Sequence, residues 1–310
     1  GISLMSEFIG FAYYAEIPSV FIDVQRVGPS TGMPTRTQQG DVMLCAYASH
    51  GDTKHPLLFP SNPHECFHMA VTAFDLAERL QTPVFMLSDL DIGMNDWMVP
   101  ELTWDDNYHP DRGKVLGPED LAKMERFSRY LDVDGDGITY RTLPGEDPKG
   151  AYFVRGSGHN RYGAYTEDSD EYQDVMDRLL VKWETAKSLV PDAVLSKADR
   201  PTRLGIVAYG SSDGAVTEAR DRLAEKGIHA DYLRIRAFPF SREVEEFLRS
   251  HDTNFVVEQN RDAQMKSLLM LQANDIANRL VSILHYNGMP IPSGWIVKGV
   301  TSHLEKEAAA

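Results

Sequence analysis

The chain has 310 residues, of which 42% are hydrophobic and 25% charged, the composition of a globular protein. Its net charge of −15 disfavours nucleic acid and anionic membranes as partners, although a local arginine pocket could still bind an anionic substrate. No apolar run is long enough to cross a bilayer. With only Cys45 and Cys66 in the chain, we expect a reducing cytoplasm, no structural disulfide and no four-cysteine iron–sulfur cluster.

The first segment predicts α/β structure around a glycine-rich loop. Residues 2–16 are apolar nearly all round and predict a mostly buried helix, and residues 18–24 predict a buried strand. Residues 24–41, which we call the signature loop, contain three glycines, two prolines and two arginines. Open α/β sheets bind ligands where loops leave the carboxyl ends of strands, and Arg26 stands there with a planar fork suited to a carboxylate. An ordinary rigid surface loop is the alternative.

The next elements continue the α/β pattern. Residues 62–80 predict a helix with Ser61 or Asn62 at its N-cap, and residues 83–89 predict another buried strand. The aspartates at the end of that strand could reach a site, although a turn is the stronger interpretation. This order favours parallel strands joined by right-handed crossovers.

Residues 95–165 predict a long irregular connection that wraps over a partner or a neighbouring domain. Within it, residues 132–137 begin like a calcium-binding EF-hand loop, but the twelfth position is Leu143 instead of glutamate. We therefore expect an aspartate-rich turn there. Residues 169–189 predict a charged helix, and residues 191–201 a linker.

Residues 201–305 alternate strands and helices and predict a doubly wound sheet. The loop at residues 210–214 could cradle phosphate, but it lacks both nucleotide-binding spacings. Residues 258–262 predict an interface or a helix cap, and residues 306–310 a frayed tail. The predicted strands are 204–209, 230–235, 254–258 and 295–297, and the predicted helices are 213–226, 241–250 and 263–284.

Residues 25–37 read Gln-Arg-Val-Gly-Pro-Ser-Thr-Gly-Met-Pro-Thr-Arg-Thr. This run resembles the signature loop of the α subunits of 2-oxoacid:ferredoxin oxidoreductases, especially of the 2-oxoglutarate type. Residues 50–52 and 136–145 resemble further segments of that family, whereas residues 158–163 depart from its more acidic run. The resemblance extends through most of the chain.

The resemblance implies an α/β fold of two domains with mostly parallel sheets. Residues 1–94 would be the C-terminal part of a pyrimidine-type thiamine-diphosphate-binding domain, residues 95–200 an irregular connection and helical linker, and residues 201–305 a transketolase-C-terminal-like domain. In the family, the glutamate that activates the cofactor lies in a segment that would precede Gly1, so we expect the chain to be N-terminally incomplete.

The resemblance also implies a reaction and its partners. Members of the family cleave a 2-oxoacid oxidatively, form an acyl-CoA such as succinyl-CoA from CoA, and pass electrons to ferredoxin. Thiamine diphosphate and Mg²⁺ would be shared with a β subunit that also carries the [4Fe–4S] cluster. The αβ pairs would dimerise.

The site residues are carried over from the same loop, and none is assigned as a metal ligand. Arg26 is the expected catalytic residue, because it would hold the 1-carboxylate of the substrate. Thr35 would hydrogen-bond the substrate, and Arg36 would contact a distal carboxylate or CoA. The remaining expected contacts are Ser30, Thr31 and Gly32 around the substrate, and Gly28 and His50 at the cofactor.

Two alternatives stay open. A transketolase-like carboligase would share the fold, although it gives no reason for the Gly-Pro-Ser-Thr-Gly loop. A noncatalytic scaffold or regulatory subunit would account for the missing glutamate. For His50, a polar turn capped by Asp52 is the stronger interpretation. The residues favour neither the oxidative direction nor reductive carboxylation.

Overall fold

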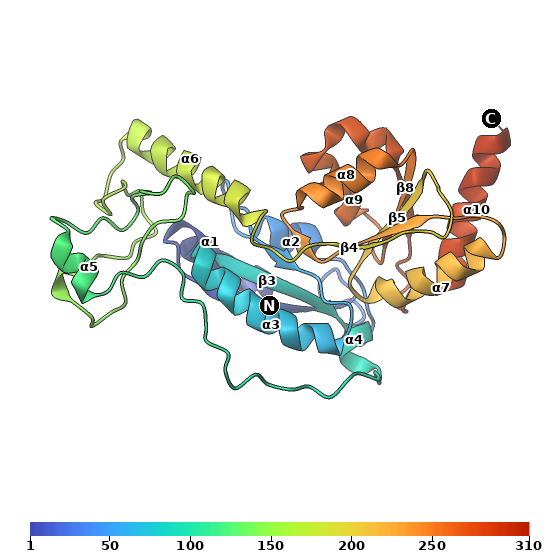
Figure 1. Ribbon diagram of the computed structural model, residues 1–310, viewed down its shortest axis with the longest axis horizontal. Coiled ribbons are helices and arrows are strands. Elements are labelled where there is room, and N and C mark those ends of the chain that lie inside the picture. The colour runs from blue at the N-terminus through green and yellow to red at the C-terminus, as the bar shows by residue number, and fades with distance from the viewer. Residues whose placement is uncertain (310) are drawn as a thin grey trace.

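A computed structural model describes residues 1–309, and two sheets organise it (Figure 1). The strands of the first sheet, in spatial order, are β1 (Ser19–Gln25), β3 (Pro83–Asp89), β2 (Leu57–Leu58) and β7 (Ala237–Phe238). β1, β3 and β2 are parallel, whereas β7 pairs with β2 in the antiparallel direction. The first sheet therefore includes a strand from far along the sequence.

The second sheet is open and doubly wound. Its strands, in spatial order, are β4 (Val194–Ser196), β6 (Asp231–Ile235), β5 (Leu204–Tyr209), β8 (Thr253–Glu258) and β9 (Leu280–Leu284). β4 is antiparallel to β6, and the other pairs are parallel. Because β5 lies between β6 and β8, the strand order reverses there. The crevice between the carboxyl ends of β5 and β8 is therefore the switch point, where open α/β sheets bind ligands. The predicted α/β fold is confirmed.

Helices flank both sheets. The longer ones are α1 (Ser6–Tyr14), α3 (Pro63–Leu80), α6 (Ser169–Ala186), α7 (Asp213–Ala224), α8 (Arg242–Ser250), α9 (Gln264–Gln272) and α10 (Ser293–Ala309). The shorter ones are η1 (Ile2–Met5), α2 (Val42–Ala46), α4 (Leu90–Met94), α5 (Pro118–Lys123), η2 (Pro148–Gly150), η3 (Gly210–Ser212) and η4 (Asn274–Arg279). Within residues 1–309, no helix is long and apolar enough to cross a membrane.

The two-residue period of the strands distributes the core. On β5, Ile206 and Ala208 pack with α7 and α10 on one face of the sheet. Val207 and Tyr209 face the opposite side, where a larger apolar cluster joins α8 and α9 to α2 and to the first sheet. Figure 1 shows these helices on the two faces of the second sheet. The larger cluster thus connects the two sheets.

The central predicted elements are confirmed. Asn62 caps α3, because its Oδ1 accepts a hydrogen bond from the Glu65 amide at 2.9 Å. Every residue of β3 is buried, as a continuous apolar run predicts. The predicted helix at residues 169–189 is α6, which ends three residues earlier at Ala186.

The last predicted strand, at residues 295–297, was wrong. These residues belong to α10, whose buried side chains include Ile296, Val297 and Val300. Three consecutive apolar residues cannot distinguish a strand from a helix, and here the burial at a spacing of three to four residues reveals the helix. α10 also extends through the predicted frayed tail as far as residue 309, and the final residue lies outside the described part.

Other boundaries also differ from the prediction. The predicted helix at 263–284 is divided into α9, η4 and β9, because its last residues pair in parallel with β8. The predicted linker at 191–201 contains β4. The predicted helix at 2–16 is η1 followed by α1, and it is not mostly buried, since Leu4 is 90% and Phe8 76% exposed.

The irregular connection covers α3 of the same chain. Figure 1 shows part of it as a long ribbon that runs below α3 in this view. The Trp104 ring lies 6.2 Å from the Phe67 ring of α3, and the Tyr108 hydroxyl donates to Asp75 at 2.5 Å. Apart from the short helices α5 and η2, residues 95–165 are irregular as predicted. Their aromatic side chains anchor them to α3, and the predicted contact with a partner or another domain stays a prediction.

The aspartate-rich turn holds an internal cation. Lys114 Nζ lies 2.6 Å from Asp134 Oδ2 and 2.8 Å from Asp136 Oδ1, and it also donates to the Ile138 carbonyl oxygen at 2.9 Å. An ammonium group therefore occupies the oxygen cluster that an EF-hand loop would offer to calcium.

A buried ion cluster joins α1, α6 and the irregular connection. The buried Glu16 carboxylate accepts hydrogen bonds from Arg178 Nη1 at 3.0 Å and from Lys182 Nζ at 2.7 Å. Burial alone would raise the pKa of Glu16, but these two cations hold it below its usual value. Arg129 adds a hydrogen bond to the Glu16 carbonyl oxygen at 2.9 Å.

We predict that Glu16→Gln destabilises the protein strongly. The substitution leaves Arg178 and Lys182 buried without a counter-charge, which costs about 3–5 kcal/mol. Urea unfolding at neutral pH measures the loss. Glu184→Gln is the control, because the Glu184–Lys187 pair lies on the exposed side of α6 and its removal should change little. Equal stability of the two variants would contradict the role of the cluster.

Candidate functional site

One buried glutamine, Gln25, connects the start of the signature loop to its end. Gln25 is the last residue of β1, and its Nε2 donates to the Ser88 carbonyl oxygen of β3 at 3.2 Å. Its Oε1 accepts from the Asp41 amide at 3.1 Å. The two ends of the loop are therefore tied together at the carboxyl edge of the first sheet. β1 is the strand predicted at 18–24, but it is not buried as predicted, since Ile22 is 56% and Val24 46% exposed.

The tip of the loop, residues 27–36, is closed by backbone hydrogen bonds into a compact ring. The Val27 amide donates to the Arg36 carbonyl oxygen at 3.0 Å, and the Met33 amide donates to the Val27 carbonyl oxygen at 3.2 Å. Gly32 adopts a φ of +52°, and a Cβ there would lie 2.1 Å from the Val27 oxygen. Only glycine fits this position. Arg26 Nη1 donates to the Thr31 carbonyl oxygen, so the ring also orients the arginine.

The far end of the loop enters the switch point of the second sheet. Gln39 is buried, and its Nε2 donates to the Tyr209 carbonyl oxygen at the end of β5 at 3.1 Å. Its amide donates to the Gln259 carbonyl oxygen just beyond β8 at 2.8 Å, and its Oε1 accepts from the Gln259 amide at 3.1 Å. A side chain from the first part of the chain thus fills the crevice where such sheets usually bind ligands.

Further polar groups complete this junction. Ser211 Oγ donates to Asp89 Oδ2 at 2.6 Å, and Gln259 Nε2 donates to Ser211 Oγ at 3.0 Å. Asn260 Nδ2 donates to the Gln39 carbonyl oxygen at 3.0 Å. Burial raises the pKa of Asp89, although the Ser211 hydroxyl opposes the shift. We call Gln39, Asp89, Ser211, Gln259 and Asn260 the polar junction.

The polar junction clarifies several sequence predictions. Asp89 takes part in the predicted turn, since its Oδ1 accepts from the Asp91 amide at 2.9 Å, and it also reaches the second sheet. The loop at 210–214 is not an open phosphate cradle, because a Cβ at Gly210 would lie 2.9 Å from Gln39 Nε2, which is bonded to the Tyr209 carbonyl oxygen. The prediction of an interface or helix cap at 258–262 is confirmed, because Glu258 Oε2 accepts from the Met265 amide at 2.7 Å in the first turn of α9.

The predicted site residues lie mainly on the exposed tip. Arg26 is half-buried at the base of the ring. Exposed residues form the tip itself, and they include Gly28, Ser30, Thr31, Gly32, Thr35 and Arg36. The structure therefore brings the expected substrate residues together in one segment.

His50 lies elsewhere. It lines a cavity of about 510 Å³ with Gly10, Tyr14 and Tyr172, and no residue of the signature loop borders that cavity. The predicted cofactor contact of His50 stays a prediction.

An acidic pair beneath the loop was missed in the sequence. Burial and the neighbouring Asp41 raise the pKa of Asp23 on β1 to about 6, and burial also raises the pKa of Asp41. Cys45 Sγ lies 3.9 Å from Asp23 Oδ2. The sequence did offer a signal for this pair, because Asp23 is a charged residue within the apolar run of β1. Asp23 therefore gains a proton at a higher pH than an ordinary aspartate does, close to the base of the loop.

Comparisons with known proteins place the chain among enzyme subunits. A family model described as pyruvate flavodoxin/ferredoxin oxidoreductase, thiamine diphosphate-binding, matches residues 1–114. The chain is 33% identical over 313 residues to 2-oxoacid:ferredoxin oxidoreductase 2, subunit alpha, of Aeropyrum pernix, covering 98% of this chain and 47% of that protein. It is 31% identical over 271 residues to the 2-oxoglutarate synthase subunit KorA of Archaeoglobus fulgidus, covering 86% of this chain and 68% of that protein.

A solved structure shares the fold. The 2-oxoglutarate:ferredoxin oxidoreductase from Magnetococcus marinus, solved with 2-oxoglutarate, coenzyme A and succinyl-CoA bound, matches with a TM-score of 0.80 at 24% identity. The match covers 97% of this chain and 51% of that chain. The chain thus spans about half the length of that structure and of the Aeropyrum relative.

We predict that Gly32→Ala opens the ring of the signature loop. A left-handed residue other than glycine costs about 1–2 kcal/mol, and here the Cβ also collides with the Val27 oxygen. Hydrogen exchange of the Met33 amide should accelerate. Gly145→Ala is the control, because Gly145 has a φ of +89° with nothing within 4 Å of its Cβ position. Unchanged protection of Met33 in Gly32→Ala would show that the ring does not need this glycine.

Proposed function

Because this chain belongs to the family of 2-oxoacid:ferredoxin oxidoreductase α subunits, we propose that it forms an enzyme of that activity with a β subunit. The enzyme cleaves a 2-oxoacid oxidatively, transfers the acyl group to CoA and reduces ferredoxin in the cytoplasm. The supporting observation is Arg26, held by its own loop at the carboxyl edge of a parallel sheet.

We infer that 2-oxoglutarate is the substrate. It carries two carboxylates, and the signature loop carries two arginines, Arg26 and Arg36. Arg26 binds the 1-carboxylate through two parallel hydrogen bonds, and Arg36 binds the distal carboxylate or CoA. The name of the Archaeoglobus relative, a 2-oxoglutarate synthase subunit, agrees with this choice.

The other loop residues position the substrate. Thr35 donates a hydrogen bond to it, and Ser30 and Thr31 border the pocket with Gly32, whose left-handed backbone gives the ring its shape. Since this tip is exposed in the chain alone, the β subunit closes the pocket and excludes water. The αβ pairs associate about a two-fold axis.

Thiamine diphosphate supplies the nucleophilic carbon when bound between the two subunits. The loop residues fit the substrate side of the cofactor, because nothing lies within 4 Å of the Cβ position of Gly28 and Arg26 balances negative charge. Among residues 1–309, no group of three or more His, Cys, Asp or Glu could hold a metal ion. In the proposed complex, the β subunit binds the Mg²⁺ and the diphosphate and carries the [4Fe–4S] cluster.

We predict that Arg26→Lys lowers kcat/KM for 2-oxoglutarate nearly as much as Arg26→Ala, by about 2–4 kcal/mol in transition-state binding. A lysine keeps the charge but loses the two-point geometry. The rate of ferredoxin reduction by the co-purified αβ complex, at a series of 2-oxoglutarate concentrations, measures kcat/KM.

The control is Arg242→Lys, because the Arg242 side chain is 87% exposed on α8. It should leave kcat/KM unchanged. Near-normal kcat/KM in Arg26→Lys would refute the clamp, whereas a wild-type complex that reduces no ferredoxin with any 2-oxoacid would favour the scaffold alternative.

A further inference from the structure

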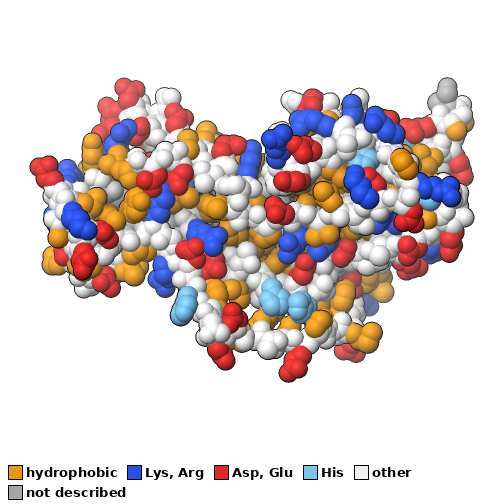
Figure 2. All heavy atoms as spheres, in the orientation of Figure 1, with side chains coloured by type: hydrophobic (Ala, Val, Ile, Leu, Met, Phe, Trp, Pro, Cys, Tyr) orange, Lys and Arg blue, Asp and Glu red, His pale blue; other side chains and the backbone are white. Residues whose placement is uncertain are grey.

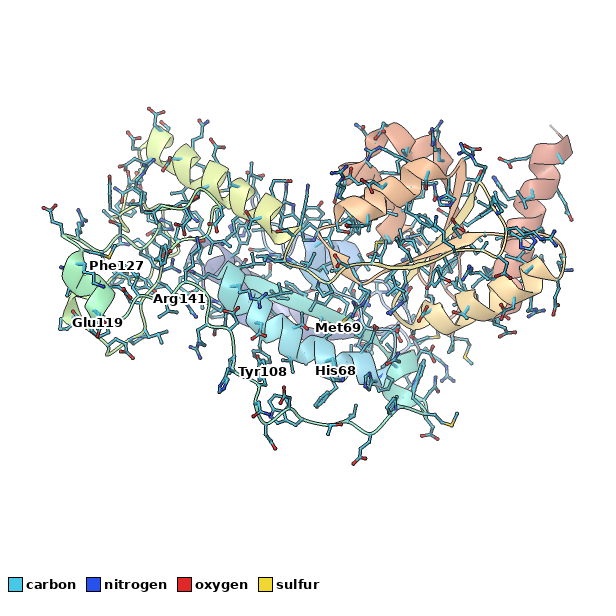
Figure 3. The ribbon with its side chains drawn as sticks, viewed as in Figure 1. His68, Met69, Tyr108, Glu119, Phe127 and Arg141 are labelled. Carbon is cyan, nitrogen blue, oxygen red and sulfur yellow. The ribbon has the colours of Figure 1, made fainter. Side chains whose placement is uncertain are left out.

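Two histidines stand one turn apart on the outer side of α3. The Nε2 atoms of His64 and His68 are 3.2 Å apart, and their ring centroids are 4.5 Å apart. His68 is exposed and His64 half-buried. Figure 2 shows histidine side chains gathered over α3, and Figure 3 shows His68 on the side of the helix that faces the irregular connection with Tyr108.

The spacing of the pair is that of a metal-binding helix. Residues 64–68 read His-Glu-Cys-Phe-His, and histidines four apart share one helical face. Two nitrogens bound to a tetrahedral zinc ion at about 2.0–2.1 Å lie roughly 3.3 Å apart. The observed separation of 3.2 Å therefore matches two ligands that already converge on one point.

The glutamate between the histidines has another role. In zinc hydrolases with this spacing it acts as the general base. Here the Glu65 carboxylate accepts hydrogen bonds from Arg234 at 2.6 and 2.9 Å and from the Ser61 amide at 2.9 Å. Glu65 is thus a structural anion, so the helix has the ligands of a metal site without its base.

We propose that His64 and His68 chelate one divalent transition-metal ion of the zinc, nickel or copper class, in a site that binds without hydrolysing. Imidazole nitrogens suit these metals. No third histidine, cysteine or carboxylate joins the pair within residues 1–309, so solvent occupies the remaining positions. The site lies outside the signature loop and is independent of the proposed catalytic activity.

Calorimetric titration of the full-length protein in its native complex, in magnesium-saturated buffer, tests the site with Zn²⁺ and with Ni²⁺. The wild type should bind one more ion per α chain than either His64→Gln or His68→Gln, or bind it at least tenfold more tightly. Bound Cu²⁺ should give an electron paramagnetic resonance spectrum of two imidazole nitrogens that loses one in each variant.

The control is His109→Gln, since His109 is an exposed histidine of the irregular connection outside the pair. It should bind metal as the wild type does. Equal binding by the wild type and by both pair variants, or no binding by the wild type at millimolar metal, would overturn the proposal and leave a histidine–histidine hydrogen bond as the sole role of the pair.

Discussion

The insertion of Gln39 into the switch point of the second sheet is the contact on which the arrangement of the site depends. Its side chain and backbone bond to Tyr209, Gln259 and Asn260, which all belong to the second sheet or to the residues directly after its strands. Each of these groups is buried, and a buried polar group left without a partner costs about 1–3 kcal/mol. The signature loop is thus fixed at both ends, at Gln25 on the first sheet and at Gln39 on the second, with Arg26 between them.

The proposed site lies at an unusual place for this kind of fold. The switch point of an open sheet is normally a ligand crevice. Here Gln39 fills that crevice from within the chain. The proposed contacts lie instead on the exposed ring of the same signature loop. The proposed reaction would require a second surface to cover the ring, and the similar proteins are named as subunits.

Local sequence signals predicted much of this structure. The N-cap residue Asn62 before an amphipathic run was sufficient to predict α3, and the continuous apolar run was sufficient to predict β3. Caps and periodicity act within a few residues, so a local pattern reveals them. Residues 280–284 form a strand only because β8 lies beside them, and Trp295-Ile296-Val297 turned out helical because α10 packs against the sheet. The signature loop was recognisable, but the partners of Gln39 lie about 170 and 220 residues away, and no local pattern reveals such pairs. The spacing of His64 and His68 was readable from the sequence, whereas their convergence required the helix.

The most direct test of this account is kcat/KM for 2-oxoglutarate in a Gln39→Leu variant of the αβ complex, together with its melting temperature. Leucine nearly preserves the volume and removes the side-chain hydrogen bonds across the switch point. A misplacement of about 1 Å far from the reacting atoms can cost on the order of 100-fold in rate. The account predicts a fall of that order in a complex that still assembles and melts as one unit. Wild-type kcat/KM in an assembled Gln39→Leu complex would contradict it.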